Sequence, residues 1–173
     1  MGELIFITGG SRSGKSGYAQ RRAEAHEGEL LYVATAAAGD AEMTARIARH
    51  QADRGTRWQT LEEPLALAER LPAAAQGKGA VLVDCLTLWL TNLYFEHHED
   101  PAPVLAAVAG LAKVLPTLAA PVYLVSNELG SGVVPENRLA RQFRDLAGEA
   151  NQLLAAAARE AWLVVAGLPL QLK

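Results

Sequence analysis

Short apolar segments alternate with longer amphipathic or alanine-rich segments along most of the chain. The apolar segments show little polar alternation, which is typical of strands that are covered on both faces of a sheet. We expect strands at residues 4–8, 30–34, 58–61, 80–84, 121–126, 163–166 and 168–172. We expect helices at residues 15–25, 40–54, 65–71 and 136–158, with further alanine-rich helical segments between 85 and about 118.

This alternation predicts an α/β fold with a mostly parallel, doubly wound sheet flanked by helices. The chain has 173 residues, half of them apolar, and it contains no internal repeat and no long linker. We therefore expect residues 1–173 to form a single domain with one substantial core.

Composition narrows the class of protein further. No apolar run approaches the roughly 20 residues that a membrane span needs, and the first residues do not resemble a signal peptide. Cys85 is the only cysteine, which excludes internal disulfides and a cysteine-based zinc site. A formal charge of −3 argues against nucleic acid as a partner. We expect a cytoplasmic protein without a membrane span.

A glycine-rich segment lies between the first expected strand and the first expected helix. Its sequence, Gly9-Gly-Ser-Arg-Ser-Gly-Lys-Ser16, matches the phosphate-binding loop (P-loop) pattern G-x-x-x-x-G-K-[ST] in full. Glycine angles at Gly9, Gly10 and Gly14 let backbone N–H groups face phosphate oxygens, and the helix start adds its positive dipole end. We predict that Lys15 contacts the β- and γ-phosphates of a nucleoside triphosphate and that Ser16 holds Mg²⁺.

An acidic residue supports this interpretation. Asp84 ends the expected strand 80–84, where a Walker-B carboxylate would reach magnesium from the strand neighbouring the P-loop strand. Many strands end in Asp because it forms turns, so the residue is informative only together with the P-loop.

A histidine on the expected helix 40–54 is a candidate nucleophile. Met43, Ile47 and His50 recur at helical spacing on one face, with Arg46 and Arg49 beside them. Two nearby guanidinium groups disfavour the protonated imidazole and can hold phosphate oxygens. A neutral imidazole could then form a covalent phosphoryl or nucleotidyl intermediate. A packed helix histidine with a solvated basic flank is the alternative, which the spacing leaves open.

The segment after the strand 121–126 carries glycines and polar groups where ligands bind in open α/β sheets. Asn127 and Glu128 are expected near the phosphate site, and Glu128 is a candidate base for phosphoryl transfer by position alone. Arg138, Arg141 and Arg144 then recur every three residues, either as a solvated stripe or as a contact for a substrate or subunit.

Taken together, several motifs resemble one family. They are the P-loop, Tyr32-Val-Ala-Thr35, Glu42-Met with Arg46-Ile and His50, Trp58 with Glu62-Glu-Pro64, Asp84-Cys-Leu-Thr87 with Thr91-Asn-Leu93, and Ser126-Asn-Glu-Leu-Gly130 with Val134-Pro-Glu-Asn-Arg-Leu-Ala-Arg141, Arg144-Asp145 and Asn151-Gln152. In this order they are similar to the bifunctional adenosylcobinamide kinase / adenosylcobinamide-phosphate guanylyltransferase family of cobalamin biosynthesis. The likeness runs from residue 4 to the C-terminus, although residues 97–120 contain no recognisable motif.

The resemblance implies a P-loop NTPase fold of the RecA type and a transferase with two activities. ATP or GTP phosphorylates the aminopropanol hydroxyl of adenosylcobinamide. GTP then guanylylates a histidine, which corresponds to His50, and the GMP passes to adenosylcobinamide phosphate to give adenosylcobinamide-GDP. Catalytic roles thus fall on His50 and Lys15, and magnesium ligation on Ser16 and Asp84. The resemblance also implies a homo-oligomer, since members can form trimers.

The nucleotide contacts that the resemblance implies are Gly9, Gly10, Ser11, Arg12, Ser13, Gly14, Lys15, Ser16, Ala34, Thr35, Ala36, Gln51, Ala52, Asp53, Arg54, Glu62 and Asp84. Two other functions stay open at this point. One is a P-loop kinase for another small alcohol, in which His50 is merely packed. The other is a nucleotide-dependent regulatory binding module without turnover.

Overall fold

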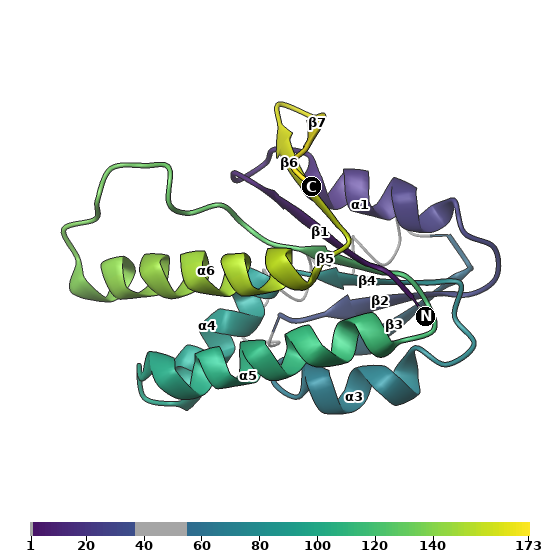
Figure 1. Cartoon of the computed structure of the whole chain (residues 1–173), viewed down its shortest axis with the longest axis horizontal. Coiled ribbons are helices and arrows are strands. Elements are labelled where there is room, and N and C mark those ends of the chain that lie inside the picture. Colours follow the sequence, from purple (N-terminus) through teal and green to yellow (C-terminus); the bar gives the residue numbers. More distant parts are fainter. Residues whose placement is uncertain (1, 37–54) are drawn as a thin grey trace.

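A computed structural model describes residues 2–36 and 55–173 of the chain. A seven-stranded sheet with helices on both faces forms its centre (Figure 1). The strands are β1 (Leu4–Gly9), β2 (Leu30–Ala34), β3 (Trp58–Glu62), β4 (Ala80–Asp84), β5 (Val122–Val125), β6 (Glu160–Val165) and β7 (Leu168–Gln171). The helices are α1 (Lys15–Glu24), α3 (Leu67–Ala74), α4 (Leu86–Glu96), α5 (Pro101–Val114), the 3-10 turn η1 (Leu115–Thr117) and α6 (Arg138–Ala157). The expected helix 40–54 lies outside the described residues.

The strand order is β3-β2-β4-β5-β1-β6-β7, and every neighbouring pair is parallel except β6 with β7. The mostly parallel sheet is therefore confirmed. The last two strands form a hairpin because only Ala166 and Gly167 connect them, which is too short for a parallel crossover. Both residues have positive φ, 51° and 80°, as a tight hairpin turn requires. The strand expected at residues 163–166 therefore ends at Val165, because Ala166 belongs to this turn.

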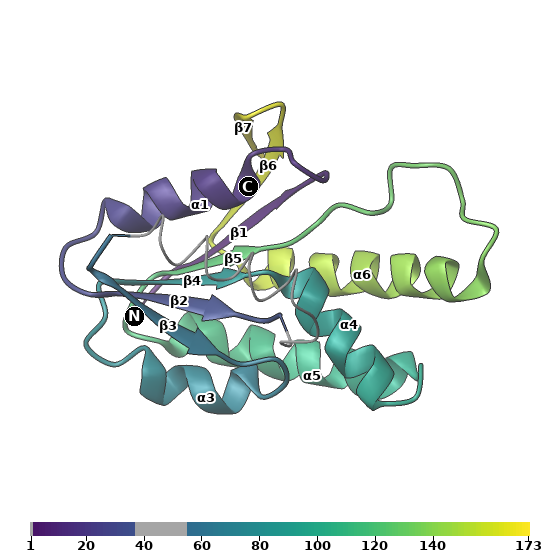
Figure 2. The ribbon, with the colours of Figure 1, turned by 180° about the vertical axis from the view of Figure 1, so that it is seen from behind.

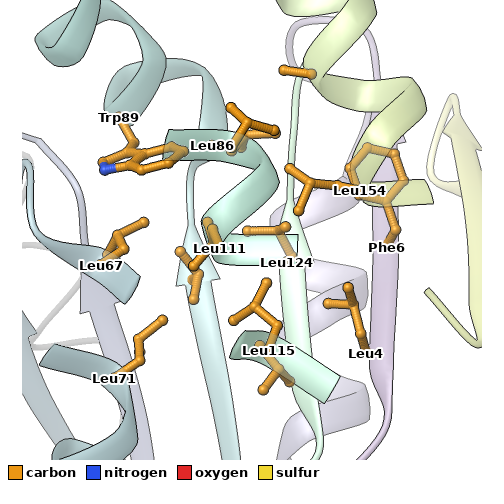
Figure 3. Packing of buried hydrophobic residues seen from close by; sticks show 14 of the residues in the cluster. Leu4, Phe6, Leu67, Leu71, Leu86, Trp89, Leu111, Leu115, Leu124 and Leu154 are labelled. Atoms are coloured by element: carbon orange, nitrogen blue, oxygen red, sulfur yellow. The ribbon is translucent and has the colours of Figure 1, made fainter. Parts of the chain in front are cut away.

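Helices α3, α4, α5 and α6 cover one face of the sheet, and α1 lies on the opposite face (Figures 1 and 2). Successive residues of a strand point to opposite faces. Leu4 and Phe6 of β1 accordingly belong to the core under α3–α6, whereas Ile5 and Ile7 pack in the core under α1. Figure 3 shows leucine and aromatic side chains from strands and helices filling the larger core. Burial on both faces explains the missing polar alternation in the sequence.

Helix α6 starts at Arg138, two residues later than expected, because the side chain of Asn137 caps it. The Asn137 Oδ1 accepts a hydrogen bond from the Ala140 N–H at 3.1 Å, which satisfies one of the free amides of the first turn. Across the ranges 2–36 and 55–173, no helix is long and apolar enough to cross a bilayer.

Candidate nucleotide-binding site

The strand register brings several predicted residues to the carboxyl edge of the sheet. One row of paired residues runs across five strands: Glu62, Ala34, Asp84, Val125 and Ile7. Gly9 lies two residues beyond Ile7, and Thr35 and Ala36 follow directly after Ala34. The P-loop, Asp84 and Glu62 therefore end their strands at the same edge, although they are far apart in sequence.

Asp84 does not lie on the strand next to the P-loop strand. Strand β5 lies between β4 and β1, so the expectation of a neighbouring strand was wrong. The hydrophobic pattern does not encode strand order, which is why the sequence could not give this detail. Asp84 is nevertheless close enough to Lys15 for its negative charge to oppose the lowering of the Lys15 pKa.

The backbone of the P-loop uses its glycines in different ways. Gly14, which precedes α1, has a φ of 94° in the left-handed region, where only glycine is unstrained. A Cβ on Gly9 would lie 2.4 Å from the Val164 carbonyl oxygen, so this glycine is required by space. Gly10 has neither a positive φ nor a close neighbour among the described residues, and the remaining left-handed position belongs to Arg12, with a φ of 55°.

The Lys15 side chain folds back over the loop and is only 8% exposed. Its ammonium group donates a hydrogen bond to the Gly10 carbonyl oxygen at 3.0 Å. Burial lowers the pKa of Lys15 below its ordinary value, while Asp84 and Cys85 act in the opposite direction. The arrangement places the lysine charge beside the turn of the loop, and its contact with the β- and γ-phosphates stays a prediction.

Two hydroxyl groups, one in the P-loop and one on the residue directly before it, are buried without a partner in the described part of the chain. The Oγ1 of Thr8 and the Oγ of Ser13 make no hydrogen bond to any residue in the ranges 2–36 and 55–173. Leaving a buried polar group unpaired costs about 1–3 kcal/mol. Phosphate oxygens of a bound ligand could accept from such hydroxyls and remove that cost.

The ends of β2 and β4 are tied together by a threonine. The Thr35 hydroxyl, which is fully buried, donates to the Cys85 carbonyl at 2.6 Å and accepts from the Cys85 N–H at 2.9 Å. Asn92 of α4 donates to the Thr35 carbonyl at 2.8 Å. These contacts fix the backbone directly after Asp84. Thr35 and Cys85 both belong to the motifs of the family resemblance, but their spacing in the sequence does not predict that they form hydrogen bonds with each other.

The β6–β7 turn braces the P-loop, which the sequence did not predict. The Gly167 N–H donates to the Ser13 carbonyl at 2.7 Å. The Gly167 Cα would lie 3.1 Å from a Cβ on Gly14, so the two backbones are in close contact. The C-terminal hairpin therefore supports the loop from the side.

The segment after β5 also begins at the P-loop, as expected. The Glu128 N–H donates to the Gly9 carbonyl at 3.0 Å, and the Asn127 N–H donates to the Thr87 hydroxyl at 3.0 Å. The Glu128 carboxylate turns back to accept from the Gly130 N–H at 2.8 Å. Position near the phosphate loop is thus confirmed for this segment, whereas the role of Glu128 as a base stays a prediction.

Two arginines of α6 hold this segment in place. Arg141 donates to the Pro135 and Glu136 carbonyls at 3.0 and 2.6 Å, and Arg144 donates to the Gly130 carbonyl at 2.7 Å. Their guanidinium groups thus satisfy loop carbonyls. The sequence analysis predicted either a solvated stripe or a contact with a substrate or subunit, and it did not predict these bonds to loop carbonyls.

The residues His50, Gln51, Ala52, Asp53 and Arg54 lie outside the described residues. Arg57, which follows them, donates to the carbonyls of Glu24 and His26, both at 2.8 Å, at the end of α1. Helix α1 begins at the P-loop, so its end lies at the opposite edge of the sheet. Arg57 is therefore not part of the site at the P-loop.

The residues at the site fit a magnesium–nucleotide complex chemically. Ser16 and Asp84 are both half-buried and provide a hydroxyl and a carboxylate, which are oxygen donors. Within the described part of the chain, no three His, Cys, Asp or Glu side chains cluster as a metal cage. Mg²⁺ bound with a nucleotide normally takes one or two protein ligands and completes its shell with phosphates and water.

A mostly parallel sheet with this loop after a central strand and an aspartate at the same edge defines a P-loop NTPase. Among solved structures, the type III secretion ATPase of pathogenic bacteria matches with a TM-score of 0.57 and 12% identity, over 94% of this chain and 51% of that one. The RadB recombinase matches with a TM-score of 0.55 and 16% identity, over 93% of this chain and 73% of that one.

A family model described as cobinamide kinase / cobinamide phosphate guanyltransferase matches residues 5–172, and the chain belongs to this family. The bifunctional adenosylcobalamin biosynthesis protein CobP of Pseudomonas aeruginosa is 47% identical over 97% of this chain and 96% of its own length. The corresponding CobU protein of Escherichia coli is 42% identical over 98% of this chain and 99% of its own length.

Proposed function

We propose that this protein is a bifunctional transferase that acts on adenosylcobinamide. It phosphorylates the aminopropanol hydroxyl with ATP or GTP and then transfers GMP from GTP to the resulting phosphate. The family match over residues 5–172 carries this proposal. The P-loop at the end of β1, with Lys15 and Asp84 beside it, supports the use of a nucleoside triphosphate.

In the kinase step, Lys15 neutralises charge on the phosphates while the hydroxyl oxygen attacks the γ-phosphorus and gives up its proton, for which Glu128 is the candidate base. The bond from that phosphorus to the β-γ bridging oxygen breaks, and the nucleoside diphosphate leaves. We propose Ser16 and Asp84 as the residues that hold Mg²⁺. When bound, the ion supplies further positive charge against the phosphate oxygens. The buried Lys15 suits this role, because a charge in a partly dry site acts more strongly than one in water.

In the second activity, we propose His50 as the nucleophile. An imidazole nitrogen attacks the α-phosphorus of GTP, the bond to the departing pyrophosphate breaks, and a guanylyl-histidine forms. A phosphate oxygen of adenosylcobinamide phosphate then attacks the same phosphorus. The phosphorus–nitrogen bond breaks, His50 is released, and adenosylcobinamide-GDP forms.

We propose that the nucleotide contacts come from Gly9 to Ser16, Ala34 to Ala36, Gln51 to Arg54, Glu62 and Asp84. The register row through Glu62, Ala34 and Asp84 supports this set, since it brings three separate strands to the P-loop edge.

GTP labelled at the α-phosphate tests the proposal. The wild-type protein should acquire an acid-labile, base-stable label, and His50→Ala should lose the label while it still phosphorylates adenosylcobinamide. Lys15→Ala should lose both activities. His98→Asn is a matched control, because His98 is exposed at the end of α4 and has a φ of 54° that Asn tolerates.

The two alternative functions, a monofunctional kinase and a regulatory binding module, predict different results in the same experiment. Phosphorylation without any label on the intact protein would indicate a monofunctional kinase. Tight GTP binding without any product from adenosylcobinamide would indicate a nucleotide-dependent regulatory module.

We also propose that the protein is a cytoplasmic homo-oligomer, for which a trimer is the arrangement suggested by the family resemblance. The β6–β7 hairpin supports assembly, because it exposes four large apolar side chains, Val165, Leu168, Leu170 and Leu172, by 58–73%. Exposed apolar patches often mark subunit contacts. Light scattering of the purified protein measures the number of subunits, and a monomer at all concentrations would contradict the proposal.

A further inference from the structure

An apolar groove of about 320 Å³ lies between the second half of α4 and the first turns of α6. Tyr94 and Phe95 line it from α4, and Leu139 and Phe143 line it from α6. The ring centroid of Tyr94 lies 6.0 Å from that of Phe143 and 6.3 Å from that of Phe95. The groove thus has an aromatic wall and is open to solvent.

Two features of this groove point to a ligand. Phe95 is 55% exposed, which is a large unfavourable area for a phenylalanine to leave in water. Tyr94 is only 1% exposed, and its hydroxyl has no hydrogen-bond partner anywhere in the ranges 2–36 and 55–173. A buried hydroxyl without a partner is costly, and a ligand that brings an amide group could satisfy it.

The groove lies at the same edge of the sheet as the P-loop. Thr87 of α4 is linked to that edge, because its hydroxyl accepts from the Asn127 N–H and the next N–H, of Glu128, donates to Gly9. Thr91 and Phe95 follow Thr87 by four and eight residues on the same helix, which corresponds to roughly 6–12 Å at 1.5 Å per residue. Figures 1 and 2 show α6 and the loop before it projecting beyond the strand ends on this side.

The loop between β5 and α6 joins the two places. Its first residues are bonded to Gly9, and its last residue, Asn137, lines the groove. Between them the loop carries three exposed apolar side chains, Leu129, Val133 and Val134, at 39%, 95% and 62%. Exposed apolar side chains are therefore present on the loop that joins the phosphate loop to the groove.

We propose that this α4/α6 groove binds one edge of the corrin macrocycle of adenosylcobinamide, while the aminopropanol arm reaches back to the P-loop. This inference rests on the proposed function. A corrinoid has apolar ring faces and amide groups on its rim, which complement the aromatic wall and the unpaired Tyr94 hydroxyl. The volume is too small to enclose a macrocycle, so the groove holds an edge and leaves the rest of the ring against the loop.

Phe95→Ala tests the aromatic wall, since an exposed side chain can be shortened without loss of the fold. The KM for adenosylcobinamide in the kinase reaction should rise about tenfold, and the KM for GTP should stay unchanged. Tyr94→Phe keeps the ring and removes only the hydroxyl, and it should raise the same KM about three- to tenfold. Leu153→Ala is the matched control, because Leu153 is a 42% exposed apolar residue further along α6 and outside the groove. The KM of this variant for adenosylcobinamide should equal that of the wild type.

An unchanged KM for adenosylcobinamide in Phe95→Ala and Tyr94→Phe would overturn the proposal. An equal rise in the KM for GTP would overturn it too, because the groove would then serve the nucleotide. A change of subunit number in Phe95→Ala, measured by light scattering, would assign the groove to a subunit contact instead.

Equilibrium dialysis of the full-length protein with adenosylcobinamide separates this inference from the proposed function. A wild-type protein that binds adenosylcobinamide without converting it, and loses that binding in Phe95→Ala, would support the groove and contradict the proposed activity. If the wild-type protein does not bind adenosylcobinamide, the proposal that the groove holds the corrin ring is wrong.

Discussion

Gly9→Ala tests how tightly the end of β1 is enclosed, and Gly10→Ala is its matched control. A methyl group on Gly9 would lie 2.4 Å from the carbonyl oxygen of Val164, its partner on β6, and 2.6 Å from the Ser13 hydroxyl. A methyl group on Gly10 would meet no described atom within 4 Å. Neither glycine has a left-handed φ, so alanine can adopt both backbone conformations.

The expected difference follows from these contacts. Both substitutions restrict the unfolded chain equally, which stabilises each variant by about 0.4–1 kcal/mol where no clash occurs. Overpacking at Gly9 costs about 1–3 kcal/mol, because a backbone oxygen cannot rotate away as a side chain can. We therefore expect the free energy of unfolding to be about 2 kcal/mol lower for Gly9→Ala than for Gly10→Ala.

Urea unfolding without nucleotide measures this difference through the fluorescence of the three tryptophans. With a urea dependence of about 2 kcal/mol per molar, the midpoint of Gly9→Ala should lie about 1 M below that of Gly10→Ala. Equal midpoints would show that β1 and β6 separate at no cost, and would refute the steric reasoning.

Three further predictions concern the surroundings of the P-loop and the end of the sheet. Gly167→Ala places a side chain at a φ of 80°, which costs about 1–2 kcal/mol. Because the Gly167 N–H holds the Ser13 carbonyl of the P-loop, this variant should bind GTP more weakly in calorimetry. An unchanged Kd for GTP would contradict the idea that the turn supports the P-loop. Burial, with a smaller contribution from Asp84, raises the pKa of Cys85 to about 11, so at pH 8 a disulfide reagent should modify the native thiol much more slowly than the urea-unfolded one. Equal rates would contradict this. The hydrogen bond from Arg22 lowers the pKa of Glu160 below its ordinary value of 4.5. The ionised carboxylate therefore stabilises the folded protein at pH values above 4.5, and this stabilisation is lost as the pH falls through the pKa of the folded state. Glu160→Gln should thus be less stable than wild type at pH 7 by up to about 1 kcal/mol, with the gap in thermal unfolding closing in acid; a gap that does not depend on pH would refute this.

Features that depend on local pattern could be predicted without a structure. Apolar runs gave the strands, because a strand buried on both faces must be apolar throughout. The P-loop could be identified from the sequence, since its pattern lies within one eight-residue segment, whereas the contact of Lys15 with phosphates stays a prediction. The resemblance that led to the family also came from motifs in their linear order, and the comparison over residues 5–172 confirmed it.

The contacts between segments that are distant in the sequence became visible in the folded chain. The fold placed β5 between β4 and β1, paired Thr35 with Cys85, and set Gly167 against Ser13. These contacts join residues 50 or more positions apart, and they depend on strand order and register, which hydrophobic periodicity does not specify. The groove between α4 and α6 has the same origin. No motif in the sequence singled out its aromatic residues, and the packing of α4 against α6 leaves Phe95 exposed at the groove.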